Sequence, residues 1–277
     1  MRILILGITG MLGHVLWHDL QKNHDVYGTI RGNNLDEGRI IKCVDAFTGN
    51  GIDLAFKEAK PEIVINCIGV IKQLKEAHDP ILSITVNSLF PHILARKCQE
   101  TGCRLIHIST DCVFSGKKGN YSENDIPDPV DIYGRSKLLG EVDHDNVLTL
   151  RTSLIGRELR GKYSLLEWFL AQKGTVKGYK RAIFSGFTTY AFTDILKELI
   201  DKYPQLNGVY HVASESINKY KLLVRLKDVF QKNIDIIPDE NLIIDRSLDS
   251  SKFQCDTSIK IPSWNEMLED LKKKEVA

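Results

Sequence analysis

The sequence lacks the features that mark membrane, secreted and nucleic-acid-binding proteins. No uninterrupted apolar run approaches the ~20 residues that span a bilayer. The 37 basic and 36 acidic side chains leave a formal net charge of +1, which gives no general attraction to nucleic acid or to an anionic membrane. The chain starts directly in strand-like sequence, which leaves no room for a signal peptide. We therefore expect a cytoplasmic protein with no nucleic-acid or membrane partner.

Cysteine is present, but not in the spacing of a disulfide framework or a zinc site. The six cysteines are scattered, and no two form a Cys-x-x-Cys pair. Cys67, Cys98 and Cys103 lie in apolar or helical surroundings, which favours buried, reduced thiols. His14 and His18 would share one helix face, but no third ligand is apparent in the sequence. We predict no metal site.

The first half of the chain alternates short apolar runs with amphipathic stretches. The apolar runs read as strands at 3–6, 25–29, 63–66, 104–109 and 147–151. The stretches between them read as helices near 11–22, 52–60, 80–100 and 131–145. Continuously apolar strands that alternate with helices indicate a parallel sheet covered on both faces. The sequence therefore predicts an α/β fold, a Rossmann-type doubly wound parallel sheet.

The hydrophobic periodicity also divides the chain into two parts. Residues 1–155 are expected to form the dinucleotide-binding Rossmann domain, completed by about 190–213, which contains a further strand. Residues 156–189 and 214–277 would form a smaller C-terminal α/β part that binds the substrate. Within this part, Pro238 is expected to mark a turn.

A glycine-rich loop directly after the first strand predicts the cofactor site. Gly7 permits a tight turn, Gly10 lets the backbone approach a pyrophosphate, and Gly13 lets the following helix pack on the strand. The N-terminus of that helix offers free N–H groups and a partial positive charge to the phosphates. The other loop residues predicted to contact the dinucleotide are Thr9, Met11 and Leu12.

The residue that follows the second strand selects between the two nicotinamide cofactors. NAD sites commonly place an acidic residue there, whereas this strand runs into Arg31, with no acid until Asp36. A guanidinium suits the 2′-phosphate of NADP, so we predict NADPH as the preferred cofactor and NADH as the second choice. The alternative is that Arg31 is a solvated loop residue. The remaining predicted cofactor contacts are Asp45, Ala46, Cys67, Ile68, Gly69, Tyr133 and Lys137.

Tyr133 and Lys137 are the candidate catalytic pair, because residues four apart share one helix face. Asp131 can cap this helix, and Thr110 follows a strand whose end would lie where open α/β folds bind ligands. The lysine cation and a charged nicotinamide would stabilise the phenolate, which draws the pKa of Tyr133 towards the range of a general acid. Thr110 would bind the same substrate oxygen, and Lys137 would also hold the nicotinamide ribose. Asp111 either orients these groups or forms an Asx-type turn.

Together these motifs resemble the extended short-chain dehydrogenase/reductases, most closely the dTDP-4-dehydrorhamnose reductase group. The resemblance covers nearly the whole chain. It is carried by the glycine loop, Asn66, Ser-Thr-Asp-Cys-Val-Phe at 109–114, Tyr-Gly-Arg-Ser-Lys at 133–137 and Leu-Arg-Thr-Ser at 150–153. It implies reduction by NADPH of the 4-keto group of a dTDP- or UDP-linked 4-keto-6-deoxyhexose, in the synthesis of cell-surface polysaccharide precursors. It also implies a Thr110–Tyr133–Lys137 catalytic triad, a nucleotide sugar as the small-molecule partner and a homodimer as a candidate assembly.

Two departures from this family fall in the expected sugar pocket. Members of the family tend to carry tyrosine where this chain has Cys112 and tryptophan where it has Leu154. The reductase chemistry does not depend on either aromatic residue, but the identity of the sugar is left open. Lys72 and Gln73 either touch the substrate or belong to a surface loop. The predicted substrate contacts are Lys72, Gln73, Cys112, Val113, Phe114 and Leu154.

Two other functions remain open on the same fold. Sugar-nucleotide epimerases and dehydratases keep NAD bound, which Arg31 argues against, and dehydratases often carry Asp-Glu where this chain has Asp111 and Cys112. The regulatory subunit of methionine adenosyltransferase shares many of these motifs and acts as a non-catalytic NADP-binding partner of another enzyme. An intact threonine, tyrosine and lysine set favours an active enzyme.

Overall fold

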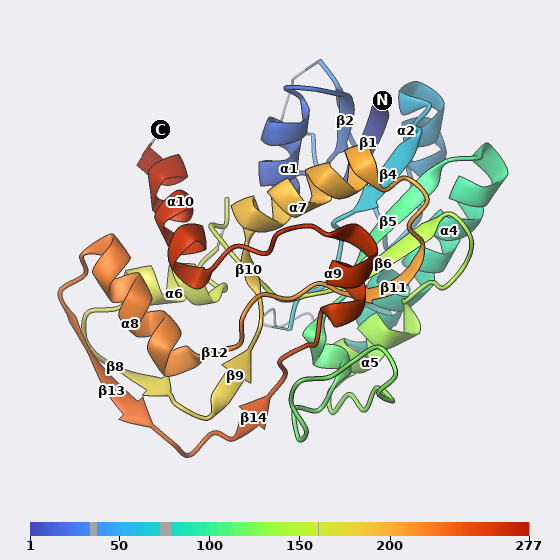
Figure 1. Ribbon diagram of the computed structural model, residues 1–277. Helices are drawn as coiled ribbons and strands as arrows, with labels where there is room; N and C mark the ends of the chain where they lie inside the picture. The colour runs from blue at the N-terminus through green and yellow to red at the C-terminus, as the bar shows by residue number, and fades with distance from the viewer. Residues whose placement is uncertain (34–37, 73–78, 160, 277) are drawn as a thin grey trace.

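A seven-stranded parallel sheet forms the larger part of the molecule (Figure 1). The structure is a computed structural model that describes residues 1–33, 38–72, 79–159 and 161–276. The strand order is β11-β6-β5-β4-β1-β2-β3, and the chain changes direction between β1 and β4. The strands are β1 (Arg2–Leu6), β2 (Asp25–Thr29), β3 (Ile40–Ile41), β4 (Ile63–Asn66), β5 (Arg104–Ile108), β6 (Val147–Arg151) and β11 (Gly208–His211). Open sheets of this kind bind ligands at such a switch point, outside the carboxyl ends of the strands.

Helices cover both faces of the sheet, because side chains alternate along each buried strand. Ile3 and Ile5 of β1 pack in one core with the helices of the first face, and Leu4 and Leu6 pack in a second core with those of the other. The first face carries α1 (Gly13–Leu20) and α7 (Thr189–Lys202), and the second carries α2 (Ile52–Ala59), α3 (Pro80–Ser83), η2 (Ile84–Leu89), α4 (Phe90–Thr101) and α5 (Ile132–Leu139). The predicted Rossmann-type α/β fold is confirmed.

Residues that follow β6 build a smaller part from short strands and helices, seen at the left of Figure 1. Its small sheets have the orders β10-β7, β12-β9-β14 and β13-β8. The strands are β7 (Leu154–Ile155), β8 (Gly174–Tyr179), β9 (Ala182–Phe184), β10 (Phe187–Thr188), β12 (Ile217–Asn218), β13 (Ile234–Asp239) and β14 (Ile244–Asp245). The helices are α6 (Leu165–Ala171), α8 (Lys219–Phe230) and α10 (Trp264–Val276), whereas α9 (Ser251–Thr257) lies beside β11 of the main sheet. No helix within the described ranges is long and apolar enough to cross a membrane.

The expected turn at Pro238 is wrong, because this residue lies inside β13 and pairs with Gly178 of β8. Proline is tolerated there since β13 has β8 as its one neighbour in this sheet, so the missing N–H need not break a second ladder.

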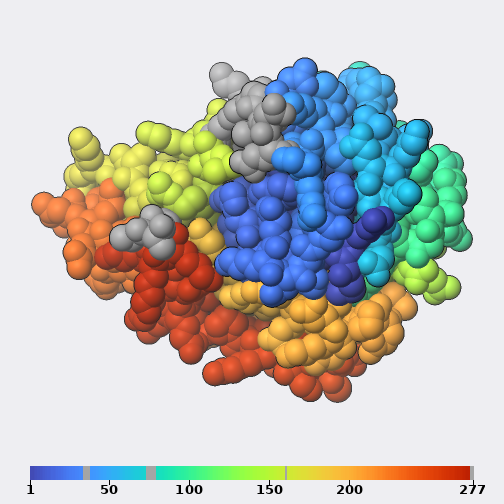
Figure 2. Space-filling view, turned by 90° about the horizontal axis from the view of Figure 1, so that it is seen from above, coloured from blue at the N-terminus to red at the C-terminus, as the bar shows by residue number. Residues whose placement is uncertain are grey.

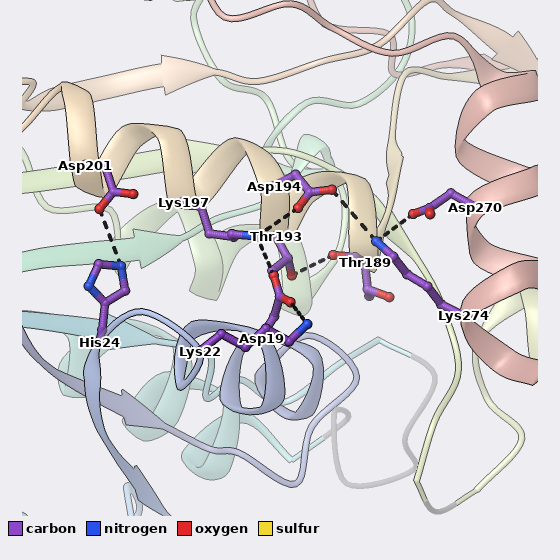
Figure 3. A network of polar contacts seen from close by, with 10 residues as sticks. All are labelled: Asp19, Lys22, His24, Thr189, Thr193, Asp194, Lys197, Asp201, Asp270 and Lys274. Atoms are coloured by element: carbon purple, nitrogen blue, oxygen red, sulfur yellow. Dashed lines mark hydrogen bonds and ion pairs between the residues drawn. The ribbon is translucent and has the colours of Figure 1, made fainter. Parts of the chain in front are cut away.

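Charged side chains join α1 to the later helices α7 and α10. The Lys197 ammonium lies 2.7 Å from Asp19 of α1 and 3.3 Å from Asp194 of its own helix (Figure 3). Lys274 of α10 contacts Asp194 at 3.9 Å and Asp270 at 2.8 Å. In Figure 2 the gold surface of α7 lies against the blue surface of the N-terminal segment. The same helices also share an apolar contact, because Leu16 of α1 and Leu199 of α7 belong to one buried cluster.

Candidate active site and cofactor site

Two glycines of the loop after β1, Gly7 and Gly13, lie where no side chain fits. Gly7 has a φ of +86°, in the left-handed region that favours glycine. A Cβ atom at Gly13 would collide with the Gly7 carbonyl oxygen. The Gly7 N–H donates to the Thr29 hydroxyl at 3.1 Å, and the Gly10 N–H donates to the Gly7 carbonyl at 3.1 Å. The loop therefore brings bare backbone to the N-terminus of α1, as binding of a pyrophosphate requires.

A cavity of about 500 Å³ opens beside this loop at the switch point of the sheet. Its volume is typical of pockets that bind small molecules and cofactors. The predicted cofactor contacts that line it are Gly7, Thr9, Gly10, Arg31, Asp45, Ala46, Cys67, Ile68 and Gly69. The structure thus brings together residues from four separate segments. Sequence reasoning missed the lining residues Thr29, Val44, Phe47, Val70, Leu82 and Val86.

Three predicted loop contacts lie outside the lining of this cavity. The Leu12 side chain packs in the core against α1, and Gly13 is the first residue of that helix. Met11 is partly exposed beside them. Leu12 and Gly13 can therefore reach a dinucleotide through their backbone atoms alone.

Arg31 lies exposed on the rim of the cavity, directly after β2, so it can be tested as the selector of the cofactor. Hydrogen bonds to charged groups contribute about 1.5–3 kcal/mol. We therefore expect Arg31→Ala to lower the NADPH/NADH ratio of kcat/KM by about 10- to 100-fold. Arg39→Ala is the matched control, because Arg39 is also exposed but pairs with Asp25 outside this lining. An unchanged ratio in Arg31→Ala, or a wild type that is faster with NADH, would contradict the assignment.

The helix α5 is fixed at both its start and its flank. The Asp131 carboxylate accepts the Gly134 N–H at 2.8 Å and caps the helix. A Cβ atom at Gly134 would collide with the Cys112 carbonyl oxygen, so α5 lies directly against η3 (Asp111–Val113), which follows β5. This contact places the Tyr133 side chain beside that of Thr110.

The predicted catalytic residues therefore meet at the carboxyl end of β5. The Lys137 ammonium donates a hydrogen bond to the Ile108 carbonyl at 2.7 Å, and the Thr110 hydroxyl accepts one from the Cys112 N–H at 3.2 Å. Thr110 also donates to the Asp111 carboxylate at 3.2 Å, which orients its hydroxyl. Of the two interpretations of Asp111, orientation of an active-site group is the one this contact supports.

Burial dominates the electrostatics of this group. It raises the pKa of Tyr133, and the nearby Cys112 and Asp111 add to the effect, while the hydrogen bond with Thr110 opposes it. Burial lowers the pKa of Lys137 to about 8. In the chain alone burial outweighs any such effect, and the lowering of the pKa of Tyr133 by Lys137 together with a charged nicotinamide stays a prediction. The phenol keeps its proton at neutral pH, as a general acid needs.

Asn87 joins the cofactor cavity to α5, and sequence reasoning missed it. It lies in η2, a π-helical segment, a form that often marks functional sites. Its side chain accepts the Val70 N–H at 2.9 Å and donates to the Val70 carbonyl at 3.0 Å and to the Ser136 hydroxyl at 3.2 Å. The signal in the sequence that could have indicated Asn87 is its position as a polar residue within an apolar helical stretch. The clamp fixes the cavity wall relative to the helix that carries Tyr133 and Lys137.

The residues after Asp111 differ in their access to a substrate. Cys112 is partly exposed beside Thr110. Val113 and Phe114 are fully buried, and Phe114 stacks on Tyr121 with 4.2 Å between ring centroids. These two residues can reach a ligand through their backbone alone.

The other predicted substrate contacts come from two further segments. Leu154 is partly exposed in β7, where it pairs with Phe187. Lys72 is exposed, and its ammonium lies 2.6 Å from Asp131, the cap of α5. Gln73 lies outside the described residues.

A Rossmann sheet with a glycine loop and a threonine, tyrosine and lysine set at the carboxyl end of β5 defines an oxidoreductase that uses a nicotinamide cofactor. The model of the RmlD substrate binding domain family matches residues 1–276, so the chain belongs to that family. The family resemblance drawn from the motifs is confirmed.

The known relatives include a subunit of methionine adenosyltransferase 2 and a probable glycan biosynthesis reductase. Methionine adenosyltransferase 2 subunit beta of Bos taurus is 30% identical over 254 residues, which cover 83% of this chain and 72% of that protein. The probable low-salt glycan biosynthesis reductase Agl14 of Haloferax volcanii is 29% identical over 258 residues, which cover 88% of this chain and 83% of that protein. The crystal structure of dTDP-4-dehydrorhamnose reductase from Bacillus anthracis in complex with NADP has a TM-score of 0.85, covers 99% of each chain and is 22% identical. At this identity the structural match supports the fold.

Proposed function

We propose that this protein uses NADPH to reduce the 4-keto group of a nucleotide-linked 4-keto-6-deoxyhexose, in the synthesis of cell-surface polysaccharide precursors. The observation that carries the proposal is the meeting of Thr110, Tyr133 and Lys137 at the carboxyl end of β5. The names of the Bacillus anthracis and Haloferax volcanii proteins, both reductases, support the same reaction class.

The residues of the cavity fit the proposed cofactor. The glycine loop has no Cβ atoms where a pyrophosphate would approach, and Arg31 offers a guanidinium to a 2′-phosphate. Lys137 would hold the nicotinamide ribose. When bound, NADPH supplies the hydride that adds to the carbonyl carbon.

The chain's own residues protonate the carbonyl oxygen of the substrate and form hydrogen bonds with it. Tyr133 gives its phenolic proton to this oxygen, which completes the alcohol, and solvent then reprotonates the phenolate. Thr110 donates a hydrogen bond to the same oxygen as charge develops on it. Asp111 holds the Thr110 hydroxyl in position before the substrate arrives.

We further propose a division of labour between the two parts of the chain. Residues 1–155, with 190–213, hold the cofactor, and 156–189 and 214–277 hold the nucleotide sugar. The pairing of β11 with β6 supports the inclusion of the later segment in the cofactor-binding part. A cytoplasmic location and a homodimer belong to the same proposal.

The test measures the oxidation of NADPH in the presence of freshly generated dTDP-, UDP- and GDP-linked 4-keto-6-deoxy sugars. The loss of NADPH absorbance reports the rate. Turnover with one nucleotide series would establish both the reaction and the substrate class. NADPH binding without turnover of any of these sugars would contradict the proposal.

The second candidate function is that of a non-catalytic partner, and the 30% identity to methionine adenosyltransferase 2 subunit beta of Bos taurus favours it. Mixing the chain with a methionine adenosyltransferase catalytic subunit on a sizing column, without sugar substrate, separates the two. A stable complex without reductase activity would favour the regulatory function.

A further inference from the structure

Two cysteines meet where α4 ends and β5 begins. Gly102 follows α4 with a φ of +74°, in the left-handed region, and its N–H donates to the Cys98 carbonyl. The Cys103 N–H donates to the same carbonyl at 3.0 Å. This second hydrogen bond characterises the Schellman motif, in which the side chains at these two positions commonly make an apolar contact. In this chain both positions are cysteine, so the end of the helix brings two thiols together.

The backbone holds the two thiols within reach of each other. Their Cα atoms are joined through the Cys98 carbonyl oxygen and the Cys103 nitrogen, so they lie at most about 7 Å apart, within the distance at which a disulfide can form. Both side chains belong to one buried cluster and are 1% and 2% exposed. Thr101 and Gly102, which directly precede Cys103, are exposed, so the pair lies close to the surface.

The two thiols differ in acidity. The pKa of Cys103 is lowered, mainly because the Cys98 thiol stabilises the Cys103 thiolate. Burial opposes this shift, and the Thr101 hydroxyl, 3.4 Å from Sγ of Cys103, adds to it. The pKa of Cys98 is raised, because its thiol is engaged by Cys103 and is buried. The thiolate is the reactive form of cysteine, so Cys103 is the member of the pair that an oxidant attacks first.

We infer that Cys98 and Cys103 form a modification site, at which a peroxide converts the two thiols to a reversible disulfide. The Cys103 thiolate attacks one peroxide oxygen, the O–O bond breaks, and Cys103 becomes a sulfenic acid while hydroxide leaves and takes up a proton. The Cys98 thiol then attacks the Cys103 sulfur, the S–O bond breaks, and water leaves. The two thiols lose two electrons, and the peroxide gains them.

The disulfide would tie the end of α4 to the start of β5. Thr110 follows the opposite end of this strand, so the cross-link leaves the catalytic residues in place. Disulfides in reducing compartments are usually transient and often sense oxidants, which fits a pair that is reduced at rest.

The test is peptide mapping of the folded protein after treatment with hydrogen peroxide. The peroxide is removed before the chain is unfolded in an alkylating reagent. Trypsin cuts after Lys97 and Arg104, so it releases residues 98–104 as one peptide with both cysteines and no other. We expect this peptide to lose the mass of two hydrogen atoms and to escape alkylation. Dithiothreitol, added before the alkylating reagent, should restore both thiols.

Variants test the order of the two steps. In Cys98→Ala, Cys103 should stop at the sulfenic acid, which dimedone traps, whereas Cys103→Ala should give little trapping at Cys98. Cys255→Ala is the matched control, because Cys255 is exposed on α9 and its loss should leave the disulfide unchanged.

The wild-type peptide decides the inference, whatever the variants do. If residues 98–104 keep two alkylated thiols after peroxide treatment, or gain oxygen atoms without losing the two hydrogens, the two cysteines are packing residues and the inference fails. If the peptide loses two hydrogens but dithiothreitol does not restore the thiols, the disulfide is not reversible, and the inference fails as well.

Discussion

Replacement of Tyr133 by phenylalanine is expected to lower kcat by about 10²–10⁴-fold, the usual contribution of a positioned proton donor. The variant keeps the ring that fills the space beside Thr110 but loses the O–H that protonates the substrate oxygen. Burial raises the pKa of Tyr133, so the phenol is fully protonated at neutral pH in the wild type. The affinity for NADPH should change little, because the cavity beside the glycine loop is not lined by Tyr133. Initial rates and an NADPH titration by fluorescence measure the two quantities.

Tyr163→Phe is the matched control for this experiment. Tyr163 is exposed and lies in the smaller part of the chain, so the same chemical change should leave kcat close to that of wild type. If Tyr133→Phe retains near-wild-type turnover, another group supplies the proton. If it loses NADPH binding together with turnover, the change has disturbed the fold, and the loss of activity says nothing about proton transfer.

Apart from β3, which is two residues long and was not predicted, the strands of the main sheet could be predicted from the sequence because each is an apolar run bounded by turn residues. Asp25–Thr29, Ile63–Asn66 and Val147–Arg151 have the predicted bounds. The helix expected at 131–145 ends earlier, at Leu139. Gly140 follows it there and packs on the Asn87 carbonyl, a contact between segments that hydrophobic periodicity along one segment does not report.

The candidate site was predictable where spacing alone determines geometry. The glycine loop and the Tyr133–Lys137 pair are local patterns. In each, the residues are close in the sequence, so one turn or one helix face sets their relative positions. The clamp by Asn87 depends on contacts between distant segments. The burial of Phe114 also depends on its packing against Tyr121. The sequence therefore indicated that Phe114 lies near the catalytic residues, but not that its side chain is inaccessible to a substrate.

Glu141 forms a buried ion pair with Arg151 that links the end of α5 to three strands of the main sheet. Its carboxylate accepts the Ser109 hydroxyl at 2.6 Å, Nε of Arg151 at 2.9 Å and Nη2 of Arg151 at 2.6 Å. The side chains of Glu141 and Arg151 are each 7% exposed. Nη1 of Arg151 lies 3.1 Å from Nε2 of His211 in β11. Through these contacts the pair links α5 to β5, β6 and β11.

Removal of this carboxylate by Glu141→Ala is expected to lower the free energy of unfolding by roughly 3–5 kcal/mol. The large effect arises because the Arg151 guanidinium would remain buried without its counter-charge. Domains of this size lose roughly 2–4 °C of Tm for each kcal/mol, so Tm should fall by roughly 10 °C. Thermal unfolding followed by circular dichroism measures it. Because Glu141 directly follows the helix of Tyr133 and Lys137, kcat should fall as well, by less than in Tyr133→Phe.

Glu198→Ala is the control that separates burial from ion pairing. Glu198 pairs with Lys202 at 2.7 Å, but both side chains are exposed, and exposed pairs contribute little. Its loss should leave Tm close to that of the wild type. Glu141→Gln should fall between the two, since the amide oxygen can still accept a hydrogen bond from Arg151 but carries no charge. If Glu141→Ala is no less stable than Glu198→Ala, the guanidinium of Arg151 must find water or another acceptor, and the buried pair is not what holds α5 to the sheet.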